Sequence, residues 1–195
     1  YGAGNLVQRG FHFYGGGVGV RSGEDPSGSP YHATDNNGQI DAVLLNFGGT
    51  AVTMEQVRFG WTGGNDSDFS LAAYTGGGST DLTSMGYADL AGNGWTTIGS
   101  YYNPGTSTKN VNPGDVSSSY WLISALNPSL GGTSNSGWYA NDFFKLASAG
   151  GSTPTTPPNT VPEPSTLLLL GSVLLMVATR RRYLQNHQNG CVVEA

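Results

Sequence analysis

Two short runs of oxygen-bearing side chains are the strongest candidates for chemistry in this chain. The first run, TDNNGQID, contains Asp35, Asn37 and Asp41. The second run, NDSD, contains Asp66 and Asp68. Ca²⁺ binds six to eight oxygens from carboxylates, amides and carbonyls on flexible loops, so these five residues are candidate calcium ligands. Both runs lie at the ends of predicted strands, which could be neighbours in the fold.

The same residue types have a second explanation that needs no cofactor. Asn and Asp side chains hydrogen-bond the backbone two residues on, and they build ordinary Asx-turns and β-turns. An EF-hand is excluded, because with Gly38 as its turn glycine the loop would place Ala33 and Leu44 where carboxylates are required. The sequence leaves two interpretations open, a chain without a cofactor and an irregular calcium site.

Signatures of catalysis are missing from the sequence. It contains no G-x-S-x-G nucleophile elbow, and its single cysteine, Cys191, lies near the C-terminus. The glycine-rich run at Gly15–Gly19 lacks the lysine and the following helix of a phosphate-binding loop. Nothing singles out a pair of carboxylates of the kind a glycosidase uses. We therefore predict that the protein is not an enzyme.

Four aromatic residues near predicted strand ends are candidates for sugar binding. Aromatic rings stack on sugar rings, and neighbouring Asp and Asn side chains can hydrogen-bond the hydroxyls. These residues are Tyr101, Tyr102, Trp138 and Tyr139. The same rings could instead pack at the strand ends, so the sequence leaves both roles open.

The charge of the chain argues against one class of partner. Before residue 160 there are five basic and eleven acidic side chains, a formal charge of −6. Affinity for nucleic acids comes mainly from basic side chains that neutralise phosphates. We predict that the protein does not bind nucleic acid.

The pattern of apolar residues predicts an all-β fold. Short runs rich in aromatic and β-branched residues alternate with Gly, Asn, Asp and Pro, which favours a single, jelly-roll-like β-sandwich domain over residues 1–149. About eight strands are expected, at residues 6–14, 18–21, 41–47, 52–61, 68–74, 95–102, 120–126 and 138–148. Alternation predicts one face of each main strand: Val43, Leu45 and Phe47; Val57, Phe59 and Trp61; Phe69, Leu71 and Ala73; Trp121, Ile123 and Ala125; Phe144 and Leu146.

The C-terminal part has a different composition. Residues 150–161 are rich in Gly, Thr and Pro and predict a disordered linker. The run Leu167–Ala178 is apolar apart from two residues and predicts a transmembrane helix, although Ser165–Thr179 would span about 22 Å of a ~30 Å hydrocarbon core. Arg180, Arg181 and Arg182 can snorkel to the interface, and by the positive-inside rule they stay cytoplasmic. Residues 183–195 are then a cytoplasmic stub.

The order of these features resembles a known signal. Pro162, Glu163 and Pro164, then the apolar run, then Arg180–Arg182, are similar to the PEP-CTERM sorting signal of Gram-negative bacteria. In that family the membrane protease exosortase recognises the signal, cuts near it and releases the protein to the cell surface or the extracellular polysaccharide matrix. The resemblance implies an exosortase partner, a transient stay in the inner membrane through residues 162–182, and export of the β domain.

Part of the β domain also resembles the exosortase-dependent surface proteins that carry this signal. The similar stretches are residues 32–38 with 41–47, and residues 59–61 with 66–71. The resemblance implies a surface domain without an established activity. We therefore expect an exported, structural or adhesive protein of the cell surface or biofilm matrix. The alternative is a carbohydrate-binding module, with or without assistance by calcium, that binds extracellular polysaccharide.

Overall fold

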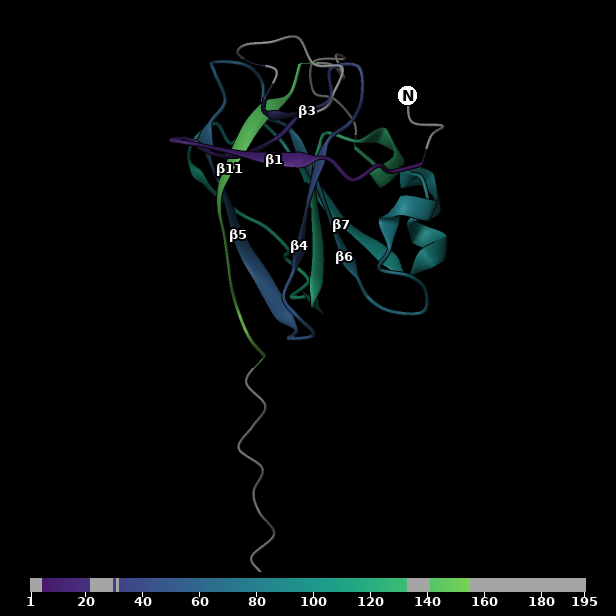
Figure 1. Cartoon of the computed structure of the whole chain (residues 1–195). Coiled ribbons are helices and arrows are strands. Elements are labelled where there is room, and N and C mark those ends of the chain that lie inside the picture. The colour runs from purple at the N-terminus through teal and green to yellow at the C-terminus, as the bar shows by residue number, and fades with distance from the viewer. Residues whose placement is uncertain (1–4, 22–29, 31, 133–140, 155–195) are drawn as a thin grey trace, which may run out of the picture. The chain divides into compact units, whose positions relative to one another are not determined.

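The computed structural model describes residues 5–21, 30, 32–132 and 141–154 (Figure 1). The chain divides into two compact units, Tyr1–Pro154 and Thr155–Ala195. All described residues belong to the first unit. The predicted sorting signal, its apolar helix and the stub lie outside the described residues. Within the described part, no helix is long and apolar enough to cross a membrane.

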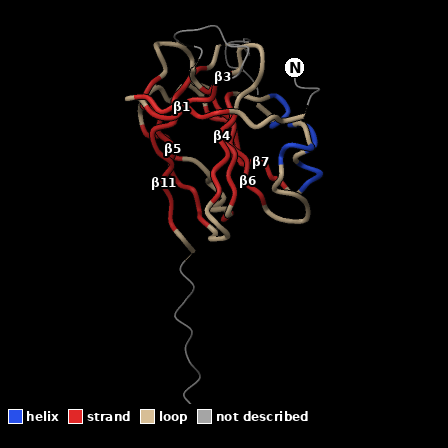
Figure 2. The backbone as a smooth tube through the Cα atoms, in the orientation of Figure 1, coloured by secondary structure: helices blue, strands red, loops and turns tan. Residues whose placement is uncertain are grey.

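Two antiparallel sheets form the domain, which confirms the predicted all-β sandwich (Figure 2). The larger sheet joins β1 (Gly10–Tyr14), β2 (Gly17–Arg21), β11 (Phe143–Ser152), β5 (Val52–Trp61) and β8 (Thr108–Asn110), with β3 (Thr34–Asp35) on β11 and β9 (Ser117–Ser118) on β5. The smaller sheet joins β4 (Ala42–Asn46), β10 (Tyr120–Ala125), β6 (Phe69–Tyr74) and β7 (Trp95–Tyr101). Strands distant in sequence are neighbours, such as β2 beside β11 and β4 beside β10, which is a jelly-roll arrangement.

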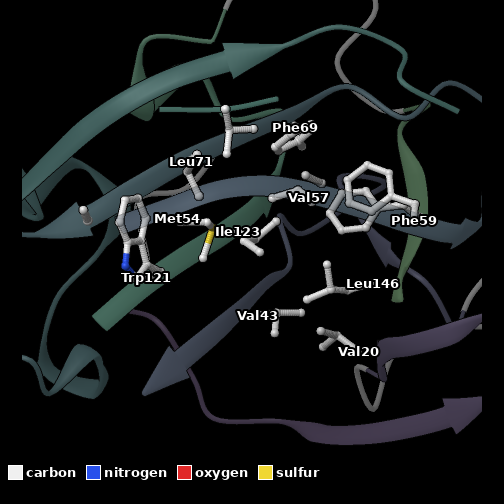
Figure 3. Close-up of a cluster of buried hydrophobic side chains, with 14 residues drawn as sticks. Val20, Val43, Met54, Val57, Phe59, Phe69, Leu71, Trp121, Ile123 and Leu146 are labelled. Carbon is white, nitrogen blue, oxygen red and sulfur yellow. The ribbon is translucent and has the colours of Figure 1, made fainter. Parts of the chain in front are cut away.

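The main core lies between the two sheets (Figure 3). Its aromatic centre is Phe59, which stacks on Phe144 with ring centroids 3.9 Å apart and meets Phe69 edge-on at 5.1 Å. Trp121 fills the far part of this core, and its indole nitrogen donates to the Ser118 carbonyl at 3.0 Å. Burial of each such ring contributes about 1.5–3 kcal/mol. The fully buried residues Phe69, Leu71, Ala73, Trp121, Ile123 and Ala125 all belong to the faces that alternation predicts.

Two residues of the predicted inner faces lie elsewhere. Phe47 follows the end of β4 and is exposed. Trp61 pairs with Lys145, whose Nζ lies 4.3 Å from the indole centre, and it is not part of the core. The ladder between β5 and β11 shifts register between Lys145 and Leu146. A bulge of this kind re-aims side chains, and alternation alone cannot locate it.

A second apolar cluster covers the outer face of the smaller sheet. Leu122 and Trp95 on the sheet pack there with Leu90 and Tyr87 from short 3-10 turns. These turns are η1 (Leu82–Ser84), η2 (Tyr87–Asp89), η3 (Ala91–Asn93) and η4 (Pro128–Leu130). Three-residue turns are too short to show a helical period, so the sequence does not reveal this layer.

The last strand continues past the predicted start of the linker. β11 ends at Ser152, and Gly150, Gly151 and Ser152 pair with β5. Gly151 permits a close approach, because a Cβ there would lie 2.2 Å from the Thr53 carbonyl oxygen. The Gly-Ser composition that suggests a flexible linker therefore serves strand pairing over these residues.

Candidate functional site: a buried carboxylate cluster

Three carboxylates meet where β6 and β11 begin. Asp66 and Asp68 precede β6, Asp142 precedes β11, and one ligand oxygen from each lies within 4.8 Å of the others. A parallel bridge joins Asp66 to Asp142, and the Phe143 amide donates to the Asp66 carbonyl at 2.8 Å. The sequence predicts two of these three residues. The sequence does not single out Asp142, because it lies 74 residues after Asp68 along the chain.

Asn36 holds Asp142 in place. The Asn36 side-chain amide donates to Asp142 Oδ2 at 2.5 Å, and its Oδ1 accepts from the Asp142 backbone amide at 3.0 Å. The Asn36 side-chain NH₂ also donates to the Leu126 carbonyl at 3.2 Å. The second oxygen of Asp142 accepts from the Asp68 backbone amide at 3.0 Å. Asn36 and Asp142 are both buried, so this clamp ties three distant segments together.

Asp68 is held by the loop after β7. Its Oδ1 accepts from the Asn103 backbone amide at 2.7 Å. Asn103 has a φ of 32°, in the left-handed region that Asn tolerates better than most residues. Ser67 supports this loop, because its hydroxyl donates to Asn103 Oδ1 at 3.2 Å and accepts from the Gly105 amide at 3.1 Å. Asp68 therefore has fixed partners in the folded chain.

Burial changes the acidity of the cluster. Burial and, to a smaller extent, the nearby charges of Asp68 and Asp66 raise the pKa of Asp142 to about 7, while the Asn36 amide opposes the shift. Burial likewise raises the pKa of Asp68 to about 6, against the lowering effect of the Asn103 amide. Ionised carboxylates this close repel one another. The cluster can relieve the repulsion by keeping a proton or by binding a cation.

The geometry meets the needs of calcium in part. Three carboxylates converge, but Ca²⁺ takes six to eight oxygens, and both oxygens of Asp142 already accept hydrogen bonds. A bound ion would therefore need water for most of its ligands. The cluster is the one group of three or more potential metal-binding side chains among the described residues.

The first predicted run contacts this cluster but does not join it. Asp35 Oδ1 accepts from the Asn37 amide at 2.9 Å, and the Asp35 carbonyl accepts from the Asp41 amide at 2.8 Å. These are turn contacts of the kind that Asp makes without a metal. The two runs meet through Asn36, the residue between Asp35 and Asn37. Asp35 and Asp41 are not among the grouped carboxylates.

The four residues predicted to stack on sugars do not form one group in the structure. Tyr101 stacks on Phe69 with centroids 5.0 Å apart, and its hydroxyl accepts from the Asn112 amide at 2.8 Å. These contacts tie the ring to the main core. Tyr102 has an exposed fraction of 36%. Trp138 and Tyr139 lie outside the described residues.

A hollow of about 710 Å³ lies beside the second apolar cluster. Residues 5–9, the start of β4 and the turn η1 surround it. Its lining combines apolar and polar side chains, including Leu6, Ile40, Leu44, Leu82, Arg9, Gln39, Asp41 and Asp81, with the half-exposed ring of Phe11. The volume is in the range of small-molecule sites. Segments far apart in sequence form this hollow, so no single motif predicts it.

Comparison with known proteins gives one match. Residues 160–182 match the family model described as the PEP-CTERM protein-sorting motif. The matched segment contains Pro162, Glu163, Pro164 and Arg180–Arg182, the residues that the sequence predicts for sorting. No curated protein and no solved structure matches the chain.

Proposed function

We propose that this protein, which carries a PEP-CTERM sorting signal at residues 160–182, is an exported, non-enzymatic protein with a structural or adhesive role at the cell surface or in the biofilm matrix. The signal implies processing by exosortase and membrane-associated sorting toward the surface. It is the observation that carries the proposal.

Each part of the signal has a physical task in this proposal. The apolar run Leu167–Ala178 holds the exported chain in the inner membrane, and Arg180–Arg182 keep its end on the cytoplasmic side. The segment around Pro162–Pro164 then lies where a membrane-embedded exosortase can reach it. Cleavage near this segment frees the β-sandwich from its temporary anchor.

The geometry of the described domain favours a structural role over catalysis. The carboxylate cluster is the most perturbed group of acids there, but Asp68 is 2% exposed and Asp142 is 1% exposed. Their oxygens accept hydrogen bonds that tie loops together. A general acid must reach its substrate within hydrogen-bond distance, which such burial opposes. The cluster serves to hold the ends of β6 and β11.

The test of the proposal is the fate of the tail. The full chain would be expressed in a Gram-negative host with and without an exosortase, and the intact mass of the exported protein measured. We expect a mass loss that corresponds to cleavage near Pro164 in the host with exosortase and no mass loss in the host without it. A matched variant, Glu163→Ala, keeps the apolar run and the arginines, and we expect it to remain uncut in the membrane fraction. An unchanged mass for the natural sequence in both hosts would refute exosortase sorting.

A second candidate function is carbohydrate binding, and the hollow beside η1 is the observation that favours it. An aromatic ring at its edge, Phe11, and the polar groups of Arg9, Gln39 and Asp81 are the mixture that sugar sites use. Leu82→Arg would fill the hollow, while Tyr102→Ala would alter an exposed ring elsewhere. If the hollow binds matrix polysaccharide, calorimetry will show binding lost in Leu82→Arg and retained in Tyr102→Ala.

Calcium assistance is part of this second candidate. The Asp66–Asp68–Asp142 cluster is then the site of the ion, and Asp66→Asn should weaken polysaccharide binding as strongly as a chelator does. Binding that is equal with calcium and with chelator would remove the ion from the proposal and leave the hollow itself untouched.

A further inference from the structure

Strand β1 is the end strand of the larger sheet among the described strands. It has five residues, GFHFY, and pairs with β2 alone among the described strands (Figure 1). It contains no proline, lysine or acid, and Phe11 and Phe13 are 48% and 81% exposed. Proteins normally guard an edge strand with charge, proline, a bulge or a covering element, because its free backbone groups can pair with another chain.

The other strands at the ends of the two sheets show such guards. β8 carries Lys109 in its centre. The ladder of β7 with β6 is interrupted by a register shift at Leu71. β4 follows directly on Asp41. Like β1, β4 contains no charge or proline of its own, but its apolar residues are buried or half-buried, whereas Phe11 and Phe13 of β1 are exposed.

The outward backbone groups of β1 belong to its two phenylalanines. Tyr14 and Gly17 flank the two-residue loop Gly15-Gly16, so they form the hydrogen-bonded pair that closes the hairpin. Antiparallel pairs alternate between hydrogen-bonded and non-bonded, which directs the groups of His12 and Gly10 toward β2 as well. The amide and carbonyl of Phe11 and of Phe13 therefore point away from the sheet, and neither residue makes a backbone hydrogen bond to another described segment.

We propose that two copies of this protein pair through β1, antiparallel, with the two-fold axis at His12. In this register Phe11 of one copy lies opposite Phe13 of the other, and each such pair exchanges two backbone hydrogen bonds. All outward groups of both phenylalanines are then satisfied. The exposed rings gain a cross-strand aromatic partner, and the two His12 residues face each other as a non-bonded pair with Cα atoms about 4.5 Å apart.

The β1–β2 hairpin is a place where two copies of this acidic chain can meet without bringing acids together. The chain has a formal net charge of −5, whereas residues 5–21 contain Arg9 and Arg21 and no acid. A contact between two β1–β2 hairpins therefore brings no acid of one copy against an acid of the other, although both hairpins carry the same two arginines. The register places Arg9 diagonally across from Phe13 of the second copy, within reach of a cation–π contact. It also keeps the two Arg9 side chains about 20 Å apart.

The inference goes beyond the sorting proposal and does not depend on it. It gives the domain a way to build a continuous sheet across two molecules, whichever compartment it occupies. The two ideas fail separately, because an uncut tail leaves β1 unchanged and a monomeric domain leaves the sorting signal unchanged.

Disulfide trapping tests the register. In a Cys191→Ser background, His12→Cys should form a dimer on mild oxidation of the full chain in detergent micelles, because non-bonded pairs place Cβ atoms within disulfide range. Thr97→Cys on β7 is the matched control at another end strand and should stay monomeric. Phe11→Cys and Phe13→Cys should each cross-link poorly alone and better when mixed, though less than His12→Cys, because the side chains of a hydrogen-bonded pair lie farther apart. Equal trapping at positions 12 and 97, or none at position 12, would overturn the pairing.

A charge on the edge tests the association itself. Sedimentation of the full chain in the same micelles should give twice the 20.3 kDa chain mass, after subtraction of the detergent, at micromolar concentration. Phe13→Lys should return it to one chain mass, with a Tm equal to that of the natural chain at high dilution, where it is monomeric, since the Phe13 side chain is 81% exposed. A natural chain that sediments as a monomer up to 100 μM, or a Phe13→Lys variant that stays dimeric, would contradict the proposal.

Discussion

The aromatic residues of β5, β6 and β11 and those of β1 share a sequence pattern and have opposite surroundings. Phe59 and Phe144 are about 1% exposed or less and stack on each other, whereas Phe13 is 81% exposed. Both sets alternate with other residues at period two. Alternation states which residues share a face of a strand. Whether another layer covers that face depends on the width of the second sheet, which a strand's own sequence does not contain.

The largest loss of stability should come from a change in the buried aromatic residues of β5, β6 and β11. Phe59→Ala leaves a cavity between Phe144 and Phe69 and should lower the free energy of unfolding by about 3–5 kcal/mol. Urea denaturation of the domain measures the change, with Phe11→Ala on β1 as the aromatic control. If Phe59→Ala and Phe11→Ala cost the same, the contrast between the two sets is wrong.

The polar residues at the end of this core should respond to pH. The pKa of Asp68 is about 6 and that of Asp142 about 7 in the folded chain, both above the ordinary value of 3.8. The folded state therefore holds protons that the unfolded state has released, so stability is full below about pH 4 and declines until about pH 7. Each retained proton costs about 1.4 kcal/mol for every pH unit between the unfolded and folded pKa, and the two losses do not add in full because the two carboxyl groups interact.

Asp68→Asn isolates this contribution. The Asn oxygen can still accept from the Asn103 amide, and its NH₂ can replace the shared proton toward Asp66. We expect Tm to fall less between pH 4 and pH 8 in the variant than in the natural chain. Millimolar calcium at pH 8 separates the two ways of relieving repulsion. A rise in Tm that Asp68→Asn lacks would favour a bound ion over a retained proton.

How much of this structure can be predicted from the sequence depends on how far apart along the chain the interacting residues are. The inner faces of β6 and β10 follow from local alternation, and the six alternate residues expected there lie in the main core: Phe69, Leu71, Ala73, Trp121, Ile123 and Ala125. Asp66 and Asp68 could be singled out because they are close in sequence. Asp142 and its clamp from Asn36 could not, since 106 residues separate the two and the jelly-roll topology brings them together.

The sorting signal is the opposite case, because it can be predicted from the sequence without any knowledge of the fold. Its residues are read directly from their order, and the family match to residues 160–182 rests on that order alone. The fold of the domain adds nothing to that prediction. Conversely, the unguarded edge of β1 is visible in the sheet order and hidden in the sequence, because GFHFY reads as an ordinary half-buried strand.

Removing the charge of Lys145 should have an intermediate effect on the free energy of unfolding. Lys145 Nζ lies 4.0 Å from the ring centre of Tyr14 and 4.3 Å from that of Trp61, which connects β11 with β1 and β5. Lys145→Gln removes the charge and keeps much of the chain length. We expect a loss of about 1 kcal/mol in unfolding free energy, as for two partly exposed cation–π contacts. Lys109→Gln, whose Nζ is 6.0 Å from the Tyr101 ring, is the control and should cost less.

The smallest effect on stability should come from the most exposed ring, and there the contrast becomes sharpest. Phe13→Ala should change the free energy of unfolding of the monomer, measured at high dilution, by less than about 0.5 kcal/mol, because the ring buries little surface within one copy. The same change should raise the dimer dissociation constant at least tenfold, because the ring is covered in the pair. A residue that is neutral for folding and essential for association marks a surface that the fold leaves for another molecule. If Phe13→Ala instead destabilises the monomer as Phe59→Ala does, β1 belongs to the core and the edge is already covered.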